Sequence, residues 1–296
     1  MPKITDPDWL EAQYNARRAI PDHLEILAEW ERRSERARSR LPCSLDLAYG
    51  EGPREKLDLF RAGAATGPVH VFIHGGYWQR GDKRVHSFLG ESMCVRGIHV
   101  AIVGYDLCPA VGIDEIVTQI RKSLAWIWRN SGDLGIDARR IQVSGHSAGG
   151  HLTAMLMATD WPTLGADLPP DLVHSAIGIS GIFELEPLIQ TSINDAVGMD
   201  LSIAKRNSPA LLKPATRAPM TVAVGGRESE EFHRQARELA AAWRKHDVPV
   251  SVLEIPDTNH FTVLEDLAGG GLLFERAMDL LNQATGDTSR VVSPTA

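Results

Sequence analysis

Ser147 lies at the centre of a Gly-x-Ser-x-Gly pattern, Gly145-His146-Ser147-Ala148-Gly149. The residues before it, Ile141 to Val143, have the alternation of a closing strand, and Ala148 to Thr159 is a run of helix formers. A serine on such a tight strand-to-helix turn is held exposed, with helix N-terminal N–H groups near any negative charge that develops beside it. The pattern therefore predicts a nucleophile, although a glycine turn with a serine N-cap would look the same.

A serine hydroxyl is a poor nucleophile at neutral pH, so it needs a general base that a carboxylate holds in place. In proteins with this serine turn, the acid and then the histidine follow the serine along the chain. His260 fits best, because the short loop Pro256 to Asn259 joins it to a predicted strand, Val250 to Ile255. His233 and His246 are alternatives, but both fall in a predicted helix, where a solvated histidine is the simpler interpretation.

Glu228 is the predicted carboxylate. It follows the predicted strand Met220 to Val224 in a turn that would present its side chain at the same sheet edge as His260. Either Asp or Glu serves as the acid in such sites. Three neighbouring acids stay open as alternatives, because acids near the start of a helix are common for electrostatic reasons alone, namely Glu230, Glu231 and Asp257. Asp106 precedes Ser147 and is predicted to be a structural turn acid.

A second glycine-rich stretch follows the short apolar strand predicted for Val69 to Ile73, and it reads His74-Gly75-Gly76-Tyr77-Trp78. A buried strand that runs directly into two glycines indicates a loop whose backbone comes close to another group, and such loops cradle oxyanions. We expect His74 to orient this loop through hydrogen bonds and to take no direct part in chemistry.

Composition is that of an ordinary soluble enzyme. The chain has 296 residues, 43% apolar and 23% charged, which is enough to bury a core without disulfides or a structural metal. The formal net charge of −7 provides no basic surface, so neither nucleic acid nor an anionic membrane is expected as a partner. A small-molecule substrate is the remaining expectation.

The cysteines and the N-terminus favour a reducing compartment. Cys43, Cys94 and Cys108 are odd in number, and their spacing suits neither a disulfide framework nor a zinc site. Residues 1–9 lack the basic start and apolar run of a signal peptide, and no stretch reaches the ~18 apolar residues needed to span a bilayer. The sequence therefore predicts a cytoplasmic protein. Its oligomeric state is open, with a homodimer as one option.

Strands and helices alternate along most of the chain, which predicts an α/β fold with a mainly parallel sheet and helices on both faces. A β-hairpin, Ser44–Tyr49 and Lys56–Phe60, is expected to open the sheet. Further strands are expected at Val69–Ile73, His99–Val103, Ile141–Ser144, Val173–Ile179, Met220–Val224 and Val250–Ile255. Helices are expected at Lys83–Val95, Ile113–Trp128, Ala148–Thr159, Arg234–Lys245 and Gly271–Gln283.

No internal repeat or linker divides the chain, so residues 1–296 are predicted to form one domain. Residues 1–42 form a helical extension in this prediction, helical from 8 to 40 with a break at Pro21. Between about 181 and 219 the alternation fails among several prolines, which predicts a small helical cap. Such an insertion would lie over the carboxyl ends of the strands, where ligands bind in open α/β sheets.

Together these motifs resemble the kynurenine formamidases (arylformamidases), which are serine hydrolases of the α/β-hydrolase fold. The resemblance is carried by His74 to Trp78, Tyr105 to Pro109, Gly145 to Leu152 and Glu228 to Gln235. It extends to Gln13 to Arg17, to the Tyr49-Gly50 turn with Leu57 to Phe60, and to Ser208-Pro209. Nearly the whole chain is therefore included.

This resemblance implies hydrolysis of the formamide of N-formyl-L-kynurenine to kynurenine and formate, without a metal or an organic cofactor. The family forms its oxyanion hole from the glycine loop and the residue after the serine, which here implies Gly75, Gly76 and Ala148. The family usually has Asp where this chain has Glu228, which puts the triad geometry in question. Alanine is common where this chain has Gly150, a change that would loosen the helix start by up to about 1 kcal/mol.

The sequence thus predicts a hydrolase with the triad Ser147, His260 and Glu228, acting on a small molecule that carries a formyl or acyl group. A carboxylesterase for short-acyl esters is the alternative, because general carboxylesterases share these motifs. A non-catalytic ligand-binding relative is a third interpretation, disfavoured because binding alone would not need all of these groups. An apolar slot for an aryl leaving group is expected from Tyr77, Trp78 and Phe183.

Overall fold

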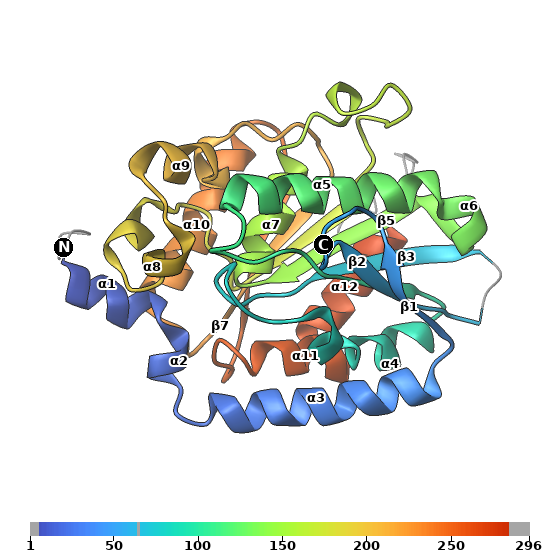
Figure 1. Ribbon diagram of the computed structural model, residues 1–296, viewed down its shortest axis with the longest axis horizontal. Coiled ribbons are helices and arrows are strands. Elements are labelled where there is room, and N and C mark those ends of the chain that lie inside the picture. Colours follow the sequence, from blue (N-terminus) through green and yellow to red (C-terminus); the bar gives the residue numbers. More distant parts are fainter. Residues whose placement is uncertain (1–5, 64–65, 284–296) are drawn as a thin grey trace, which may run out of the picture.

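An eight-stranded sheet crosses the centre of the molecule in the order β1-β2-β4-β3-β5-β6-β7-β8 (Figure 1). The computed structural model describes residues 6–63 and 66–283. The strands are β1 (Cys43–Ala48), β2 (Lys56–Phe60), β3 (Gly67–Ile73), β4 (His99–Val103), β5 (Ile136–His146), β6 (Ser175–Ile179), β7 (Met220–Gly225) and β8 (Val250–Ile255). β2 pairs antiparallel with β1 and β4, and every other neighbouring pair is parallel.

This arrangement confirms the predicted hairpin and the mainly parallel sheet. The hairpin turn is closed by the Tyr49 N–H, which donates to the Glu55 carbonyl at 3.0 Å. β3 and β4 are buried along their whole length, as expected for parallel strands that helices cover on both sides. Continuous apolar runs were therefore a sound signal for the inner strands.

Helices form a layer on each face of the sheet (Figure 1). One layer contains α5 (Ile113–Arg129), α7 (Ala148–Met157) and α10 (Glu230–Arg244), and the other contains α3 (His23–Arg40), α4 (Leu89–Cys94), α11 (Val263–Gly269) and α12 (Leu272–Asn282). Successive strand residues divide between the layers: Val71 packs with the first and Phe72 with the second. The short helices are α1 (Pro7–Tyr14), α2 (Ala16–Ala19), α6 (Ser131–Leu134), α8 (Asn194–Val197) and α9 (Leu201–Arg206). In the described residues, no helix has the length and apolar character that crossing a membrane requires.

The N-terminal extension folds as three helices where two were expected, and its first five residues lie outside the described ones. α1 ends at Tyr14, and the side-chain oxygen of the next residue, Asn15, caps α2. Pro21 lies between α2 and α3. α3 runs beneath α4 and α11 in Figure 1. Trp30 of α3 is 1% exposed and donates its indole N–H to Glu265 Oε1 at 2.6 Å. The extension is therefore packed into the domain.

The helix predicted for residues 83–95 is interrupted. A 3-10 turn covers Lys83–His86, and α4 begins only at Leu89. Ser34 of α3 explains the break, because its hydroxyl donates to the Val85 carbonyl at 2.8 Å and accepts from the Phe88 N–H at 3.1 Å. These tertiary bonds satisfy groups that a continuous helix would pair internally.

Further elements differ from the sequence prediction. α10 begins at Glu230, four residues before the predicted start at Arg234, and β6 begins at Ser175, two residues after the predicted start at Val173. β5 begins at Ile136, five residues before the predicted start at Ile141. α11 was not predicted, although Val263, Leu264 and Leu267 have helical spacing and are buried. The strands and helices that deliver the candidate site residues lie where they were expected.

The segment from 181 to 219 forms short helices, and these lie beside α1 and α10 (Figure 1). The Ser192 N–H donates to Glu11 Oε2 at 2.9 Å, which ties the segment to α1. Trp243 of α10 donates its indole N–H to the Pro209 carbonyl at 3.0 Å. The segment thus joins the N-terminal extension to the helix that follows Glu228.

Candidate active site

Ser147 occupies a strained turn between β5 and α7. Its backbone has φ 57° and ψ −117°, in a region that side-chain-bearing residues rarely adopt. The Ser147 N–H donates to the Ile179 carbonyl of β6 at 2.8 Å, which fixes the turn against the next strand. Strain of this kind persists only where the surroundings enforce it, and it concentrates at functional sites.

Two glycines allow the close packing around this turn. A Cβ added to Gly145 would overlap the Gly149 carbonyl, and a Cβ added to Gly149 would overlap the Ile73 carbonyl at the end of β3. Both obstacles are backbone atoms, so no side chain could move aside to make room. The two fixed glycines of the motif are therefore explained by contact between strand, turn and helix.

We expect Gly149→Ala to lose about 3 kcal/mol or more of unfolding free energy, because the sheet itself would have to shift. Urea denaturation measures this loss. Gly269→Ala is the matched control, since a Cβ there meets nothing within 4 Å. Equal stability of the two variants would contradict the described turn.

Glu228 and His260 form a buried pair at the carboxyl edge of the sheet. Glu228 Oε2 lies 2.7 Å from His260 Nδ1, and the two side chains are only 1% and 5% exposed. The other carboxylate oxygen, Oε1, accepts from the Gly225 N–H at 2.7 Å and from the Ser180 hydroxyl at 2.5 Å. A carboxylate held by these donors orients the His260 ring and leaves Nε2 as its other ring nitrogen.

The other acids and histidines considered from sequence are engaged elsewhere. Glu231 pairs with Arg234, Asp257 with Arg227 and His233 with Glu254. Asp106 accepts from the Arg54 N–H and the Gln119 amide, as a structural turn acid should. Glu230 and His246 are both exposed. Among all of these candidates, Glu228 is the acid that contacts His260.

His146 is a site residue that the sequence reasoning missed. Its Nε2–H donates to the backbone carbonyl of His260 at 2.7 Å, and the two rings lie 4.7 Å apart. Burial and the neighbouring His260 keep the pKa of His146 well below its usual value, so it remains neutral and can act as a fixed donor. His146 therefore anchors the loop that carries His260. The sequence did hold a signal for His146, because it is the variable residue directly before Ser147 in the Gly-x-Ser-x-Gly pattern.

The glycine loop lies directly against the serine turn. A Cβ added to Gly75 would come within 2.7 Å of the His146 carbonyl and 3.0 Å of Ser147 Cβ. Gly76 has φ +116°, a conformation that favours glycine. This proximity puts the backbone of the loop beside the Ser147 side chain.

His74 is buried against the glycine loop and bonds to it. Its ring stacks on Tyr105 at 4.3 Å between centroids, and its Nδ1–H donates to the Gly75 carbonyl at 2.8 Å. Burial and the nearby His86 lower the pKa of His74 to about 3, so the ring is neutral. These contacts are those of an orienting residue.

Ser147 and His260 line one cavity of about 370 Å³. The serine turn and the glycine loop line one part of it, and α2 and α3 of the N-terminal extension line another part. The lining side chains and backbone are Arg17, Leu24, Leu27, Ala28, Trp30, Glu31, Gly75, Gly76, Tyr77, Arg80, Gly81, Asp82, Val85, His86, His146, Ser147, His260 and Phe261. None of the described residues from 181 to 219 lines it, so the expected covering role falls to the extension and not to the predicted cap.

The three aromatic side chains that were predicted to contact the substrate do not all lie at the cavity. Tyr77 lines the cavity and is fixed by its hydroxyl, which donates to the Tyr14 carbonyl at 2.6 Å and accepts from the Ala16 N–H at 3.0 Å. Burial raises the pKa of Tyr77 to about 12. Trp78 and Phe183 are fully buried in the core and do not line the cavity. Trp78 and Phe183 therefore do not form the predicted slot for an aryl leaving group.

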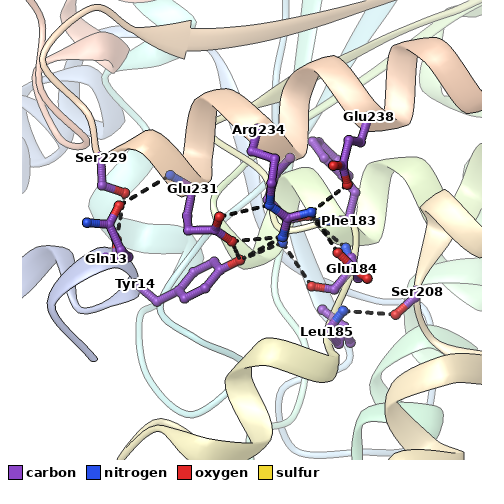
Figure 2. Close-up of polar contacts among 11 residues, drawn as sticks. Gln13, Tyr14, Phe183, Glu184, Leu185, Ser208, Ser229, Glu231, Arg234 and Glu238 are labelled. Carbon is purple, nitrogen blue, oxygen red and sulfur yellow. Dashed lines mark hydrogen bonds and ion pairs between the residues drawn. The ribbon is translucent and has the colours of Figure 1, made fainter. Parts of the chain in front are cut away.

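A buried polar network holds the N-terminal extension in place. Figure 2 shows Tyr14 of α1 reaching the charged pair on α10: its hydroxyl donates to Glu231 Oε2 at 2.5 Å, and Arg234 Nη2 lies 2.7 Å from the same oxygen. The Ser229 hydroxyl donates to the Gln13 carbonyl at 2.7 Å. Two motifs more than 200 residues apart, 13–17 and 228–235, thus form one contact. It links the wall of the cavity to the segment that carries Glu228.

The fold and this site define a hydrolase of the α/β-hydrolase fold. A candidate thioesterase from Silicibacter sp. TM1040 has a solved structure that is 34% identical, covers 88% of this chain and 94% of its own, and has a TM-score of 0.77. Esterase B from Lactobacillus rhamnosis matches at a TM-score of 0.67, with 19% identity over 89% of this chain and 97% of its own, which supports the fold alone.

Sequence comparison places the chain more closely. The kynurenine formamidase of Danio rerio is 31% identical over 292 residues, spanning 93% of this chain and 96% of the fish protein. The kynurenine formamidase of Salmo salar is 31% identical over 285 residues, spanning 90% and 94%. The BD-FAE family model matches residues 57–177. The chain belongs to the kynurenine formamidase family, which confirms the resemblance seen in its motifs.

Proposed function

We propose that this enzyme hydrolyses the formamide of N-formyl-L-kynurenine, or of a similar aryl formamide, to the free amine and formate. One observation carries the proposal: Ser147 and a histidine paired with a buried carboxylate line one cavity, in a chain that aligns with kynurenine formamidases over 93% of its length. The substrate is a small molecule with a formyl or acyl group. The predicted absence of a nucleic acid or membrane partner rests on the net charge of −7, and the cytoplasmic location and homodimer stay predictions.

In the proposed mechanism, His260 Nε2 takes the proton of the Ser147 hydroxyl as its oxygen attacks the formyl carbon. Glu228 stabilises the imidazolium and keeps Nδ1 protonated. The tetrahedral intermediate then collapses, and His260 passes the proton to the leaving amine nitrogen as the C–N bond breaks. Water attacks the formyl-enzyme by the same route and releases formate.

The oxyanion that forms in both steps needs donors beside Ser147. We assign this role to the backbone N–H groups of Gly75, Gly76 and Ala148. The contact between the glycine loop and the serine turn supports the assignment, as does the position of Ala148 at the first turn of α7. Each such donor contributes about 3 kcal/mol to transition-state stabilisation in comparable sites.

A short-acyl carboxylesterase remains the second candidate function. The same proton transfers cleave an ester, with an alcohol replacing the amine as leaving group. The candidate thioesterase that is 34% identical to this chain is consistent with hydrolysis of a small acyl group that is not bound to nitrogen. A non-catalytic ligand-binding protein is the third, and turnover on either substrate would eliminate it.

We expect N-formyl-L-kynurenine to give a larger kcat/KM than p-nitrophenyl acetate, measured side by side in steady state with the wild-type enzyme. The apolar wall formed by Leu24, Leu27 and Phe261 gives the longer N-formyl-L-kynurenine more contact than the smaller p-nitrophenyl acetate. Turnover of the ester alone would keep the catalytic residues and overturn the substrate assignment. Inactivity on both would favour the binding protein.

A further inference from the structure

Two arginines face the same cavity as Ser147, and the proposed chemistry does not use them. Arg17 comes from α2, and Arg80 comes from the turn that follows the glycine loop. Both belong to the lining of the cavity, Arg17 partly buried and Arg80 exposed. Their positions call for an explanation, because two positive charges on the lining of one cavity repel each other.

Arg80 is held against the glycine loop. Its backbone N–H donates to the Gly76 carbonyl at 3.1 Å. A Cβ added to Gly76 would lie 3.1 Å from Arg80 Cγ, so the stem of the side chain starts directly beside this loop. Among the residues that the structure describes, its guanidinium has one side-chain hydrogen bond, a long one from Nη2 to Gln79 Oε1 at 3.4 Å. Arg80 therefore sits next to the backbone assigned to the oxyanion.

Arg17 reaches the same cavity from α2. The residue before it, Ala16, donates its N–H to the Tyr77 hydroxyl, and that hydroxyl donates to the Tyr14 carbonyl. The Tyr14 side chain is in turn fixed to Glu231 of α10 in the network of Figure 2. These bonds hold the start of α2 against Tyr77, so Arg17, Tyr77 and Arg80 line the same cavity.

The charge of the two arginines is not balanced by a contact. Within the described residues, neither guanidinium forms an ion pair with a carboxylate. Burial and the nearby Arg80 charge lower the pKa of Arg17. Two acids face the cavity, but Asp82 pairs with Arg54 at 3.2 Å and Glu31 is exposed at the rim. Like charges held together beside a cavity favour an anionic ligand.

We propose that Arg17 and Arg80 form a carboxylate subsite, so that the enzyme selects substrates with an anionic group on the part that leaves as the amine or alcohol. The proposal rests on the proposed function for the identity of the reacting bond. A formyl group is a single carbon bonded to oxygen and hydrogen, so it cannot carry a carboxylate. The anionic group must therefore belong to the leaving group. Guanidinium groups suit this role because their paired N–H donors match the two oxygens of a carboxylate.

The test uses two pairs of substrates that differ in charge. N-formyl-L-kynurenine is compared with 2-formamidoacetophenone, which keeps the aryl ketone and lacks the amino-acid group. 4-Acetoxybenzoate is compared with its neutral methyl ester, cleaved at the acetyl bond. The enzymes are wild type, Arg17→Gln, Arg80→Gln and the matched control Arg18→Gln. Arg18 neighbours Arg17 on α2 but is exposed, pairs with Glu11 at 3.4 Å and does not line the cavity.

We expect Arg17→Gln and Arg80→Gln each to lower kcat/KM about 10- to 100-fold on the anionic substrates, chiefly through KM, and to change it by less than about 2-fold on the neutral ones. Arg17→Lys should recover part of the loss, because it restores the charge without the paired donors. Arg18→Gln should behave as wild type on all four substrates, and the thermal unfolding midpoint should be the same in every variant.

Equal losses on charged and neutral substrates would overturn the proposal, because they would show that the arginines only position the loop. Unchanged kinetics on the anionic substrates would overturn it as well. Failure of the proposed function is distinguishable, since it would appear as ester cleavage without formamide cleavage. In that case the charge preference within the ester pair still decides the role of the arginines.

Discussion

Ser147→Ala is expected to lower kcat on N-formyl-L-kynurenine and on p-nitrophenyl acetate by about 10,000-fold or more, with the fold intact. The substitution removes the attacking oxygen and keeps the Cβ, so the strained turn and its bond to the Ile179 carbonyl are preserved. Loss on both substrates is expected because both reactions begin with the same attack. Steady-state rates and far-UV circular dichroism measure the two parts of this prediction.

Ser123→Ala provides the matched control. Ser123 is 1% exposed in α5, donates to the Ile120 carbonyl and does not line the cavity. Its loss removes one buried serine hydroxyl without touching the site, so the rates should stay near those of the wild type. Residual formamidase activity in Ser147→Ala above about one thousandth of wild type would mean that another group attacks the substrate.

Glu228→Gln is expected to lower kcat about 1,000- to 10,000-fold. Glutamine has nearly the same shape, but its neutral amide neither stabilises an imidazolium nor requires Nδ1 to carry the proton. Glu230→Gln is the matched control, because Glu230 lies two residues away in the first turn of α10 and is exposed. Equal activities of the two variants would remove Glu228 from the mechanism.

The length of the Glu228 side chain is tested separately by Glu228→Asp. Both carboxylate oxygens are engaged, Oε1 by Gly225 and Ser180 and Oε2 by His260. Shortening the chain by one methylene cannot preserve all of these bonds, so we expect a loss of about 10-fold or more in kcat. Full activity would show that the turn adapts to the shorter aspartate.

The sequence predicted well those parts of the site that depend on local backbone geometry. The serine turn, the glycine loop and the acid turn each follow the end of a buried apolar strand, and parallel strands bring such ends to one edge of the sheet. The contact between Glu228 and His260 follows from that arrangement. Chain order and strand positions favoured this pair, but they left Glu230, Glu231 and Asp257 open as alternative acids.

The walls of the cavity depend on tertiary packing and were not predictable in this way. Apolar periodicity showed that Trp78 and Phe183 are suited to burial, but it could not distinguish the core from a pocket. Leu24 and Leu27 of α3 face the cavity, although their helical spacing alone does not distinguish a cavity wall from a core contact. The departure at Gly150 also has a tertiary cause, since a Cβ there would come within 2.9 Å of Gly181 Cα.

The most direct measurement is a titration of the enzyme with a phosphonate ester that reacts with nucleophilic serines. Formate release from N-formyl-L-kynurenine is followed at each step, and peptide mass spectrometry locates the label. We expect the label on Ser147 and a fractional loss of formamidase activity equal to the fraction of Ser147 labelled. Formate release that persists when Ser147 is fully labelled would contradict the assignment of Ser147 as the nucleophile of a formamidase.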